Sequence, residues 1–239
     1  MYVLGRHDLT VNHESVDFGV PHPIPSDDDN EYHVSRNFTY LARIVRTIKK
    51  MSTVYIKLRR TKDWAVNPEF QQIEHNISAY FSELPADMII TYPADGSPPY
   101  LPSSFLGNLH SYYNLMQILY HRPVLSFLDP TAHEAQWKRR MLICYNAAKT
   151  LCRLQEALLK QYGLVDLQSM QRGFSFALYA GLSCVVIHLV CSNYFNDVSP
   201  RIFFPTSFLF VAHSHYRRLP LFLQIQTSTV MLVSIFNVI

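Results

Sequence analysis

The sequence predicts an all-α fold, in which five or six helices pack as an irregular bundle with short connections marked by proline. Three observations predict it. Apolar residues recur at three- and four-residue steps over most of the chain, which is the period of one buried helix face. Prolines gather between these stretches, with five in residues 85–102. Helix-start signals, such as a capping pair at Thr131 and Glu134, stand ahead of the apolar patterns.

The composition changes along the chain. Apolar residues make up 49% of the 239 residues and charged residues only 16%, below the roughly 25% usual in soluble proteins. The net charge of +3 is too small to indicate a nucleic-acid-binding protein by itself. Residues 173–239 hold four of the charged residues: Asp197, Arg201, Arg217 and Arg218. The length allows one domain, or one and a fraction.

The N-terminal segment, residues 1–33, is expected to be irregular. Residues 20–30 contain three prolines followed by three aspartates. Proline fixes an extended backbone and like charges repel, so this segment should lie at the surface. Its acidic end can also cap the next helix, because anions are favoured near a helix N-terminus.

Two amphipathic helices are expected next, over residues 35–60 and 68–84. The apolar stripe of the first is Phe38, Leu41, Val45, Ile48, Tyr55 and Leu58. Its cations are expected to form a solvated face: Arg43, Arg46, Lys49, Lys50, Lys57, Arg59 and Arg60. The second helix opens on Pro68, which suits a first turn, and its stripe is Phe70, Ile73, Ile77, Phe81 and Leu84. Residues 85–102 then form a loop.

Residues 105–123 predict a helix with an abrupt end. Its apolar stripe is Phe105, Leu109, Tyr112, Met116 and Leu119. Pro123 has no backbone N–H and biases Arg122 away from helical geometry. We therefore expect the helix to stop at Pro123.

Residues 131–163 give the clearest helical pattern in the chain. Thr131 and Glu134 fit a capping box, and Gly163 stands where a helix C-terminal glycine belongs. The stripe between them is Trp137, Met141, Cys144, Ala148, Leu151, Leu154, Leu158 and Tyr162. A further helix is expected to open near Asp166, to carry Leu167, Met170 and Phe174, and to become apolar on every side over residues 173–191.

Residues 191–239 form an atypical apolar tail. Pro205 and Pro220 interrupt apolar runs that have neither the 3.6-residue nor the 2.0-residue period. Because charge disappears where the periodicity fails, we expect this tail to be the product of a wrong splice or reading frame in a predicted gene, and not a native continuation. Residues 34–190 are then the helical domain.

Several motifs together resemble the regulatory middle region of fungal zinc-cluster transcription factors. Residues 109–123 (Leu-His-Ser-Tyr-Tyr-Asn-Leu-Met-Gln-Ile-Leu-Tyr-His-Arg-Pro) are similar to the hallmark helix of that region. Residues 3–7 (Val-Leu-Gly-Arg-His), the proline and acid segment 15–28, and residues 41–56 resemble earlier parts of it. Residues 141–148 (Met-Leu-Ile-Cys-Tyr-Asn-Ala-Ala) resemble its alanine-rich helix. These motifs follow the family's order and cover roughly residues 1–190.

The resemblance implies a fragment of a regulator of RNA polymerase II transcription, located in the nucleus. Within the family, regulators of acetate use and gluconeogenesis are most similar. The resemblance implies the transcription machinery or co-regulators as partners, and a homodimer in the full-length protein. The family reads DNA through a zinc cluster of six closely spaced cysteines, whereas this chain has four cysteines, all after residue 143. No cofactor and no direct DNA contact are therefore expected from this fragment.

The four cysteines, Cys144, Cys152, Cys184 and Cys191, are expected to be free and buried in a reducing compartment. No C-x-x-C pair occurs, and the sequence near Met1 lacks the apolar core of a secretory signal. Cys184, His188 and Cys191 lie at helical spacing on one face, so a zinc site is conceivable. A structural zinc site needs four ligands and no fourth is evident, so we expect core cysteines with one satisfied histidine.

Two further groups of residues were weighed as sites. His121 and Arg122 could bind an effector, but cations at a helix C-terminus more commonly complement its dipole and bond the last free carbonyls. The cations of residues 43–60 could contact phosphates, but no aromatic residues interleave with them as a stacking platform would need. Catalytic motifs such as G-x-S-x-G, a glycine-rich phosphate loop and H-E-x-x-H are missing from the sequence, so an enzyme is not expected.

The alternative is a membrane-associated protein with one or two C-terminal spanning helices. Residues 173–191 carry one histidine and no full charge, close to the roughly twenty apolar residues that a span needs. Residues 219–239 are a weaker second candidate, since they contain a proline and two glutamines. Residues 173–191 continue an amphipathic helix and lack a cationic flank on their C-terminal side, which favours the soluble bundle.

Overall fold

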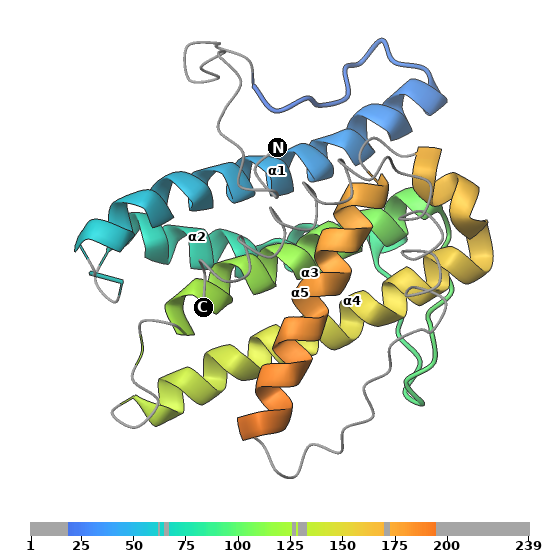
Figure 1. The fold of residues 1–239 in the computed structure, drawn as a ribbon. Coiled ribbons are helices and arrows are strands. Elements are labelled where there is room, and N and C mark those ends of the chain that lie inside the picture. The colour runs from blue at the N-terminus through green and yellow to red at the C-terminus, as the bar shows by residue number, and fades with distance from the viewer. Residues whose placement is uncertain are drawn as a thin grey trace, which may run out of the picture. The chain divides into compact units, whose positions relative to one another are not determined.

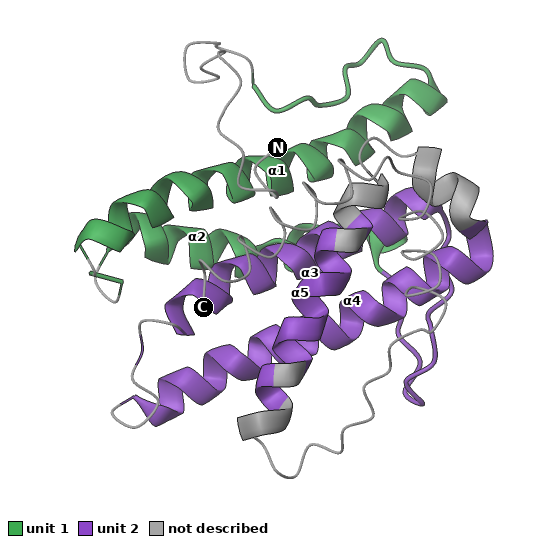
Figure 2. Cartoon of the chain, viewed as in Figure 1, with its two compact units in different colours: residues 1–89 green, residues 90–239 purple. Residues whose placement is uncertain are grey.

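The computed structural model describes residues 19–61, 63–64, 67–125, 128, 133–169 and 173–194. Across these ranges the secondary structure consists of five α-helices with two short 3₁₀ helices and no strand, which confirms the all-α class (Figure 1). The chain forms two compact units, residues 1–89 and residues 90–239 (Figure 2). The boundary between the two units lies inside residues 34–190, which were expected to form one helical domain. The predicted division of the chain into domains therefore stays a prediction.

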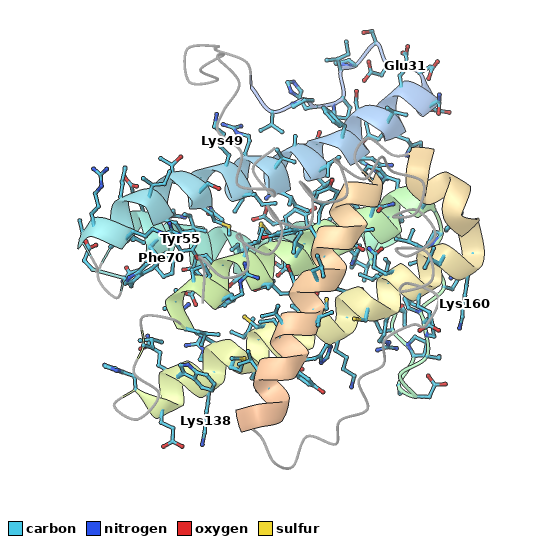
Figure 3. The ribbon with its side chains drawn as sticks, viewed as in Figure 1. Glu31, Lys49, Tyr55, Phe70, Lys138 and Lys160 are labelled. Carbon is cyan, nitrogen blue, oxygen red and sulfur yellow. The ribbon has the colours of Figure 1, made fainter. Side chains whose placement is uncertain are left out.

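The first long helix, α1 (Asp29–Thr61), begins six residues before the expected start at Ser35. A capping box explains the early start. The backbone N–H of Glu31 donates to Asp28 Oδ1 at 2.8 Å, and the backbone N–H of Asp28 donates to Glu31 Oε2 at 3.2 Å. Glu31 lies in the first turn of the helix (Figure 3). The prediction that the acidic run caps this helix is confirmed, and the irregular segment ends before Asp29.

The buried face of α1 differs in part from the predicted stripe. The helix buries Ile44, Ile48, Met51, Val54 and Leu58. Of the predicted stripe only Ile48 and Leu58 are buried, whereas Phe38 is 51% and Val45 is 47% exposed. Apolar side chains occur on both sides of the true face, as the exposed Ile56 demonstrates, so periodicity alone did not fix the rotation of the helix.

The second helix, α2 (Pro68–Ala79), begins where the sequence predicted. Asn67 caps it, because its side-chain oxygen accepts a hydrogen bond from the backbone N–H of Phe70 at 3.0 Å. Phe70, Ile73 and Ile77 are buried as expected. The helix ends at Ala79 and not at Leu84, and two 3₁₀ turns follow, η3 (Phe81–Glu83) and η4 (Ala86–Met88). Pro85 accounts for the break between the turns, since the residue before a proline is driven to extended geometry.

The second unit contains α3 (Ser104–Leu125), α4 (Glu134–Ser169) and α5 (Gly173–Tyr194), and α4 packs against both of the others (Figure 1). Contacts between α3 and α4 run in reverse order along the chain. Gln155 Nε2 on α4 donates to Ser111 Oγ on α3 at 3.3 Å, and Tyr162 Oη donates to the Leu101 carbonyl at 2.7 Å. The two helices are therefore antiparallel.

Helix α3 is buried on most of its sides, unlike the single stripe that the sequence predicted. Leu109 and Met116 are buried, but Phe105, Tyr112 and Leu119 are partly exposed. Polar side chains take up much of the remaining buried surface by bonding to carbonyls one turn earlier. Asn108 Nδ2 donates to the Ser104 carbonyl, Ser111 Oγ to the Gly107 carbonyl and Asn114 Nδ2 to the His110 carbonyl, each at 2.8 Å.

The expected stop of α3 at Pro123 is wrong, because the helix continues through Pro123 to Leu125. A proline beyond the first turn removes the bond that its N–H would give to the carbonyl four residues earlier, and its ring crowds that carbonyl. The helix nevertheless adds two further residues after Pro123. Val124, beyond the proline, is 2% exposed, so its burial favours the extension.

Helix α4 confirms the predicted stripe. Trp137, Met141, Cys144, Ala148, Leu151, Leu154 and Leu158 are all buried, and Tyr162 is partly exposed. Gly163 has φ 74° and ψ −176°, a conformation that only glycine adopts readily, and it breaks the helix where the sequence predicted. Helical residues resume after it and run to Ser169, close to the expected start near Asp166. Thr131 of the predicted capping box lies outside the described residues.

Helix α5 runs from Gly173 to Tyr194, whereas one helix was expected from near Asp166 through residue 191. Residues 170–172, between α4 and α5, lie outside the described residues. The buried side of α5 includes Ala177, Ala180, Cys184, Ile187 and Cys191. Among the described residues, no helix has both the length and the apolar character that crossing a membrane requires. Residues 195–239 lie outside the described part of the chain, and with them most of the predicted tail and the second candidate span.

Candidate functional site

The four cysteines face one another in two pairs where α4 packs against α5. Cys144 and Cys152 lie two turns apart on α4, and Cys184 and Cys191 lie two turns apart on α5. Cys152 and Cys184 lie close enough to shift each other's pKa, and the Cys144 thiol lies close enough to Cys191 to feel its charge. This reversed order shows that α4 and α5 are antiparallel. All four cysteines are free.

The backbones of the two helices approach closely at the first pair. The Cys184 thiol donates a hydrogen bond to the Ala148 carbonyl on α4, with 3.5 Å between sulfur and oxygen. Ala148 and Ala180 are both 0% exposed, and such small side chains let a short cysteine reach the opposite backbone. Cys152 follows Ala148 by one helical turn, so the Cys184 sulfur lies beside it.

His188 completes a cluster with Cys152 and Cys184. It lies one turn after Cys184 on α5 and close enough to Cys152 to lower the pKa of that thiol. Its ring meets the Tyr145 ring edge to face, with centroids 5.3 Å apart and an interplanar angle of 82°. Cys152 and His188 are partly exposed, whereas Cys184 is buried. The cluster therefore has one inner thiol and one thiol that solvent can reach.

The surroundings of the cluster shift the pKa values of the thiols in opposite directions. Hydrogen bonds from Cys184 and His188, together with the charge of His188, lower the pKa of Cys152. The hydrogen bond to Cys152 and complete burial raise the pKa of Cys184. Burial raises the pKa of Cys144 to about 12 and that of Cys191 to about 11. Cys152 is thus the thiol most readily converted to the nucleophilic thiolate.

The predicted group of Cys184, His188 and Cys191 is only partly assembled. The structure joins Cys184 and His188 to Cys152, which the sequence analysis did not include, and places Cys191 beside Cys144. In the part of the chain that the structure describes, no three His, Cys, Asp or Glu side chains are arranged to hold a metal ion. The sequence did contain a signal for these pairs. The two cysteines of α4 are eight residues apart and those of α5 are seven apart, and both spacings correspond to about two helical turns, so each helix presents two cysteines on one face.

His121 is not the cationic helix cap that the sequence predicted. It is 4% exposed, and Arg140 on α4 lies 3.1 Å from its Nδ1 atom. Burial, and the nearby charges of Arg140 and then Arg139, lower the pKa of His121 to about 3. The ring is therefore neutral, and its Nδ1 accepts a hydrogen bond from the Arg140 guanidinium. His121 thus joins α3 to α4 and adds no charge to the helix end. Arg122 is partly exposed in the last turn of α3.

The neutral state of His121 predicts a loss of stability in acid. In the unfolded chain His121 binds a proton below about pH 6.5, its ordinary pKa. In the folded chain it stays neutral until about pH 3, so acid favours the unfolded chain. Lowering the pH from about 7.5 to about 5 should reduce the free energy of unfolding by about 2 kcal/mol through this group. Urea unfolding of the wild type and of His121→Gln at both pH values measures it. The glutamine oxygen can still accept from Arg140 but does not titrate, so an identical pH dependence in both proteins would refute this role.

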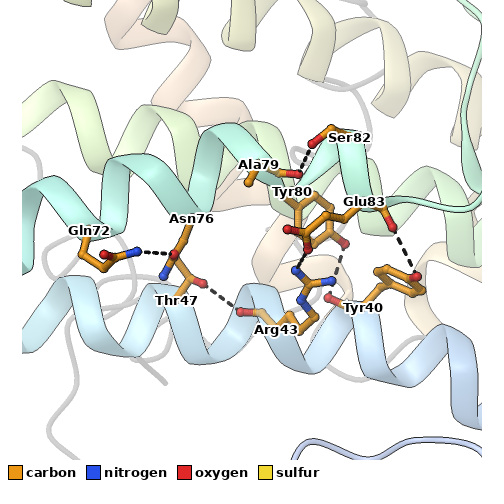
Figure 4. A network of polar contacts seen from close by, with 9 residues as sticks. All are labelled: Tyr40, Arg43, Thr47, Gln72, Asn76, Ala79, Tyr80, Ser82 and Glu83. Carbon is orange, nitrogen blue, oxygen red and sulfur yellow. Dashed lines mark hydrogen bonds and ion pairs between the residues drawn. The ribbon is translucent and has the colours of Figure 1, made fainter.

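The cations of α1 are partly engaged in contacts within their own unit. Figure 4 shows Arg43 paired with Glu83, with its guanidinium over the rings of Tyr40 and Tyr80 at 5.7 and 5.8 Å from their centroids. Tyr40 Oη donates to the Glu83 carbonyl, and Tyr80 Oη to the Tyr40 carbonyl, both at 3.3 Å. Lys57 pairs with Glu69 at 3.1 Å. These contacts join α1 to α2 and the turn after it. Because the later residue of α1 pairs with the earlier residue of that segment, the two run antiparallel.

Four other cations of this helix fit a solvated face. Arg46, Lys50, Arg59 and Arg60 are exposed. Their charges are spread along the length of α1, which is the expected arrangement for side chains that serve solubility. Contact of these residues with nucleic acid stays untested.

Comparison with known proteins gave no relative: a scan with protein-family models, a search of curated proteins and a search of solved structures each found no match.

Proposed function

We propose that this chain is a piece of a fungal zinc-cluster transcription factor, in which residues 34–190 form the regulatory middle domain as an irregular helical bundle. The observation that supports the proposal is the series of motifs in the family's order over residues 1–190. The tail was expected to begin at residue 191, but α5 runs to Tyr194 and buries Cys191, so in this proposal the bundle includes the end of α5. The domain regulates RNA polymerase II transcription by packing and protein contact, without catalysis.

The positions of two of the motifs support this proposal. Residues 109–123 lie within α3, and residues 141–148 lie within α4, which packs against it. Met141, Cys144 and Ala148 of the second motif are buried, as expected for a motif that maintains a core. Motifs with this role fit a domain whose function depends on the arrangement of its helices.

The proposed partners follow from the resemblance. The transcription machinery or co-regulators would bind the domain in the nucleus, and the full-length protein would dimerise. DNA would be read by a zinc cluster that these residues do not contain, because such a cluster needs six closely spaced cysteines and the four here are far apart.

A reporter experiment tests the proposed role. The chain is joined to an unrelated DNA-binding domain, and expression from a promoter carrying that domain's site is measured in a fungal cell. We expect the wild type and Leu142→Ala, which changes an exposed residue, to alter expression equally. Leu151→Ala, which removes a fully buried side chain, should abolish the effect. Expression that is the same with and without the chain would contradict a regulatory role.

Two further results separate the proposal from its alternatives. In a gel-shift assay at physiological salt, the isolated chain should show no preference for any DNA sequence, so a strong site preference would contradict the proposal. In cell fractionation the chain should be found in the soluble or nuclear pool. A pellet that resists carbonate extraction would instead favour the membrane-associated alternative with spans at residues 173–191 and 219–239.

A further inference from the structure

We propose that Cys152 and Cys184 are a reversible redox pair, which a hydroperoxide oxidises to a disulfide with His188 positioned to assist. The inference rests on the contact between α4 and α5 and is independent of the proposed transcriptional role. Three features of the cluster lead to it: Cys184 lies against the turn of α4 that carries Cys152, Cys152 is the more accessible of the two, and an imidazole lies near it.

The first feature is the proximity of the two sulfur atoms. The Cys184 sulfur lies against the turn of α4 that leads from Ala148 to Cys152, and its proximity lowers the pKa of the Cys152 thiol. The Cys184 sulfur also lies 3.5 Å from the Ala148 carbonyl, so the short side chain spans the whole gap between the two backbones. A disulfide demands that its two cysteines approach this closely, and here the packing of α4 on α5 supplies the approach.

The second feature is the asymmetry of exposure and charge. Cys152 is partly exposed and Cys184 is 1% exposed, so a small oxidant from solvent meets Cys152 first. Cys152 also has the lowered pKa of the pair, because Cys184 and His188 lie beside it. Glu156, one turn later on α4, opposes this effect, but Lys160 lies 2.6 Å from its carboxylate and offsets its charge.

The third feature is the histidine beside the accessible thiol. His188 lies near enough to Cys152 to lower its pKa, and its ring packs nearly at right angles to that of Tyr145, which limits the orientations that the imidazole can adopt. In this position His188 stabilises the thiolate by hydrogen bonding and charge. His188 is thus the positioning residue, and Cys152 is the residue that reacts.

The reaction balances in two steps. The Cys152 thiolate attacks one oxygen of hydrogen peroxide, the O–O bond breaks, and the products are a Cys152 sulfenic acid and hydroxide, which takes up a proton to become water. The Cys184 sulfur then attacks the Cys152 sulfur, the S–OH bond breaks, and the departing hydroxyl leaves as water with the proton of Cys184. The two sulfurs lose two electrons in total, and the two peroxide oxygens gain them. A dithiol reductant reverses the change.

The second pair of cysteines provides an internal control. Cys144 and Cys191 also face each other across the two helices, but both are buried and burial raises the pKa of each. Neither of these thiols is accessible to a small oxidant or held as a thiolate. Hydrogen peroxide should therefore oxidise Cys152 and Cys184 and leave Cys144 and Cys191 reduced, although both pairs lie on the same two helices.

Peptide mapping of the whole wild-type chain tests the proposal without any substitution. The folded protein is treated with a brief pulse of iodoacetamide, then unfolded and labelled with a second alkylating agent. We expect Cys152 to react about tenfold or more faster than Cys144. After hydrogen peroxide in place of iodoacetamide, the peptides of Cys152 and Cys184 should appear linked, and dithiothreitol should release them.

Matched variants complete the test. Cys184→Ala should stop at a sulfenic acid on Cys152 that dimedone traps, whereas Cys144→Ala should form the same disulfide as the wild type. His188→Gln should slow the alkylation of Cys152 and leave that of Cys191 unchanged. A Cys152 that reacts no faster than Cys144, or a peroxide-induced link that joins any other pair, would overturn the proposal.

Discussion

Replacing Leu151 with alanine should lower the free energy of unfolding by about 3 kcal/mol, within the range for truncating a leucine in a packed core. Leu151 lies at the middle of α4 and is 0% exposed. The substitution removes buried methyl groups and leaves a cavity that the surrounding helices can fill only in part. Urea unfolding, followed by the helical signal in circular dichroism, measures the loss.

The matched control lies on the same helix. Leu142 is 55% exposed, so Leu142→Ala removes the same atoms from a site with few contacts. Its effect should be within about 0.5 kcal/mol of zero, as for most surface substitutions. Equal losses for Leu142→Ala and Leu151→Ala would mean that the buried stripe of α4 does not face a packed core.

A valine at position 107 should destabilise the chain by about 3 kcal/mol through overpacking. A Cβ atom added to Gly107 would lie 2.8 Å from Leu101 Cδ1 and 2.8 Å from Leu158 Cδ2. A β-branched side chain adds two more carbons to the same space on a helix, so both leucines would have to move out of the core. Thermal unfolding by calorimetry measures the change.

Gly107→Ala is the graded control for this site. Alanine improves the intrinsic helix propensity by about 1 kcal/mol and adds only the Cβ, which meets the mobile ends of the two leucines. We expect its cost to be clearly smaller than that of Gly107→Val. A valine variant as stable as the wild type would refute the close approach of α3 to α4 at this position.

Apolar periodicity identified the buried face of some helices better than that of others, for a physical reason. The stripe of α4 was predicted almost completely because its apolar residues form one stripe between clear boundary signals, ending at Gly163. The face of α1 was placed incorrectly in part, because apolar residues also lie on its exposed side, as at Val45 and Ile56. Periodicity determines the face of a helix only when one side is clearly polar.

The extensive burial of α3 escaped prediction because its buried polar residues do not look like core residues. Asn108, Ser111 and Asn114 satisfy themselves by bonding to backbone carbonyls of their own helix, so they can be buried at small cost. A pattern based on apolar residues counts such positions as exposed. The passage of the helix through Pro123 was missed for a related reason, since burial of Val124 is a tertiary effect.

The residues of the candidate site depend on pairing that a linear pattern does not contain. Cys184 and His188 share one helix and were recognised together, but Cys152 belongs to α4 and becomes their neighbour only through antiparallel packing. The same holds for Arg140, which is close to His121 only because α3 and α4 pack side by side. Spacing along one helix was predictable, whereas the partner from the next helix required the structure.

We expect the helical stretches up to about residue 190 to fold into stably packed helices. Far-ultraviolet circular dichroism with thermal unfolding, applied to residues 1–190 in plain buffer, tests it most directly. We predict a strongly helical spectrum that is lost in a cooperative transition, and a transition at lower temperature for Leu151→Ala. A spectrum dominated by strand, or a gradual loss of signal without a transition, would contradict the claim.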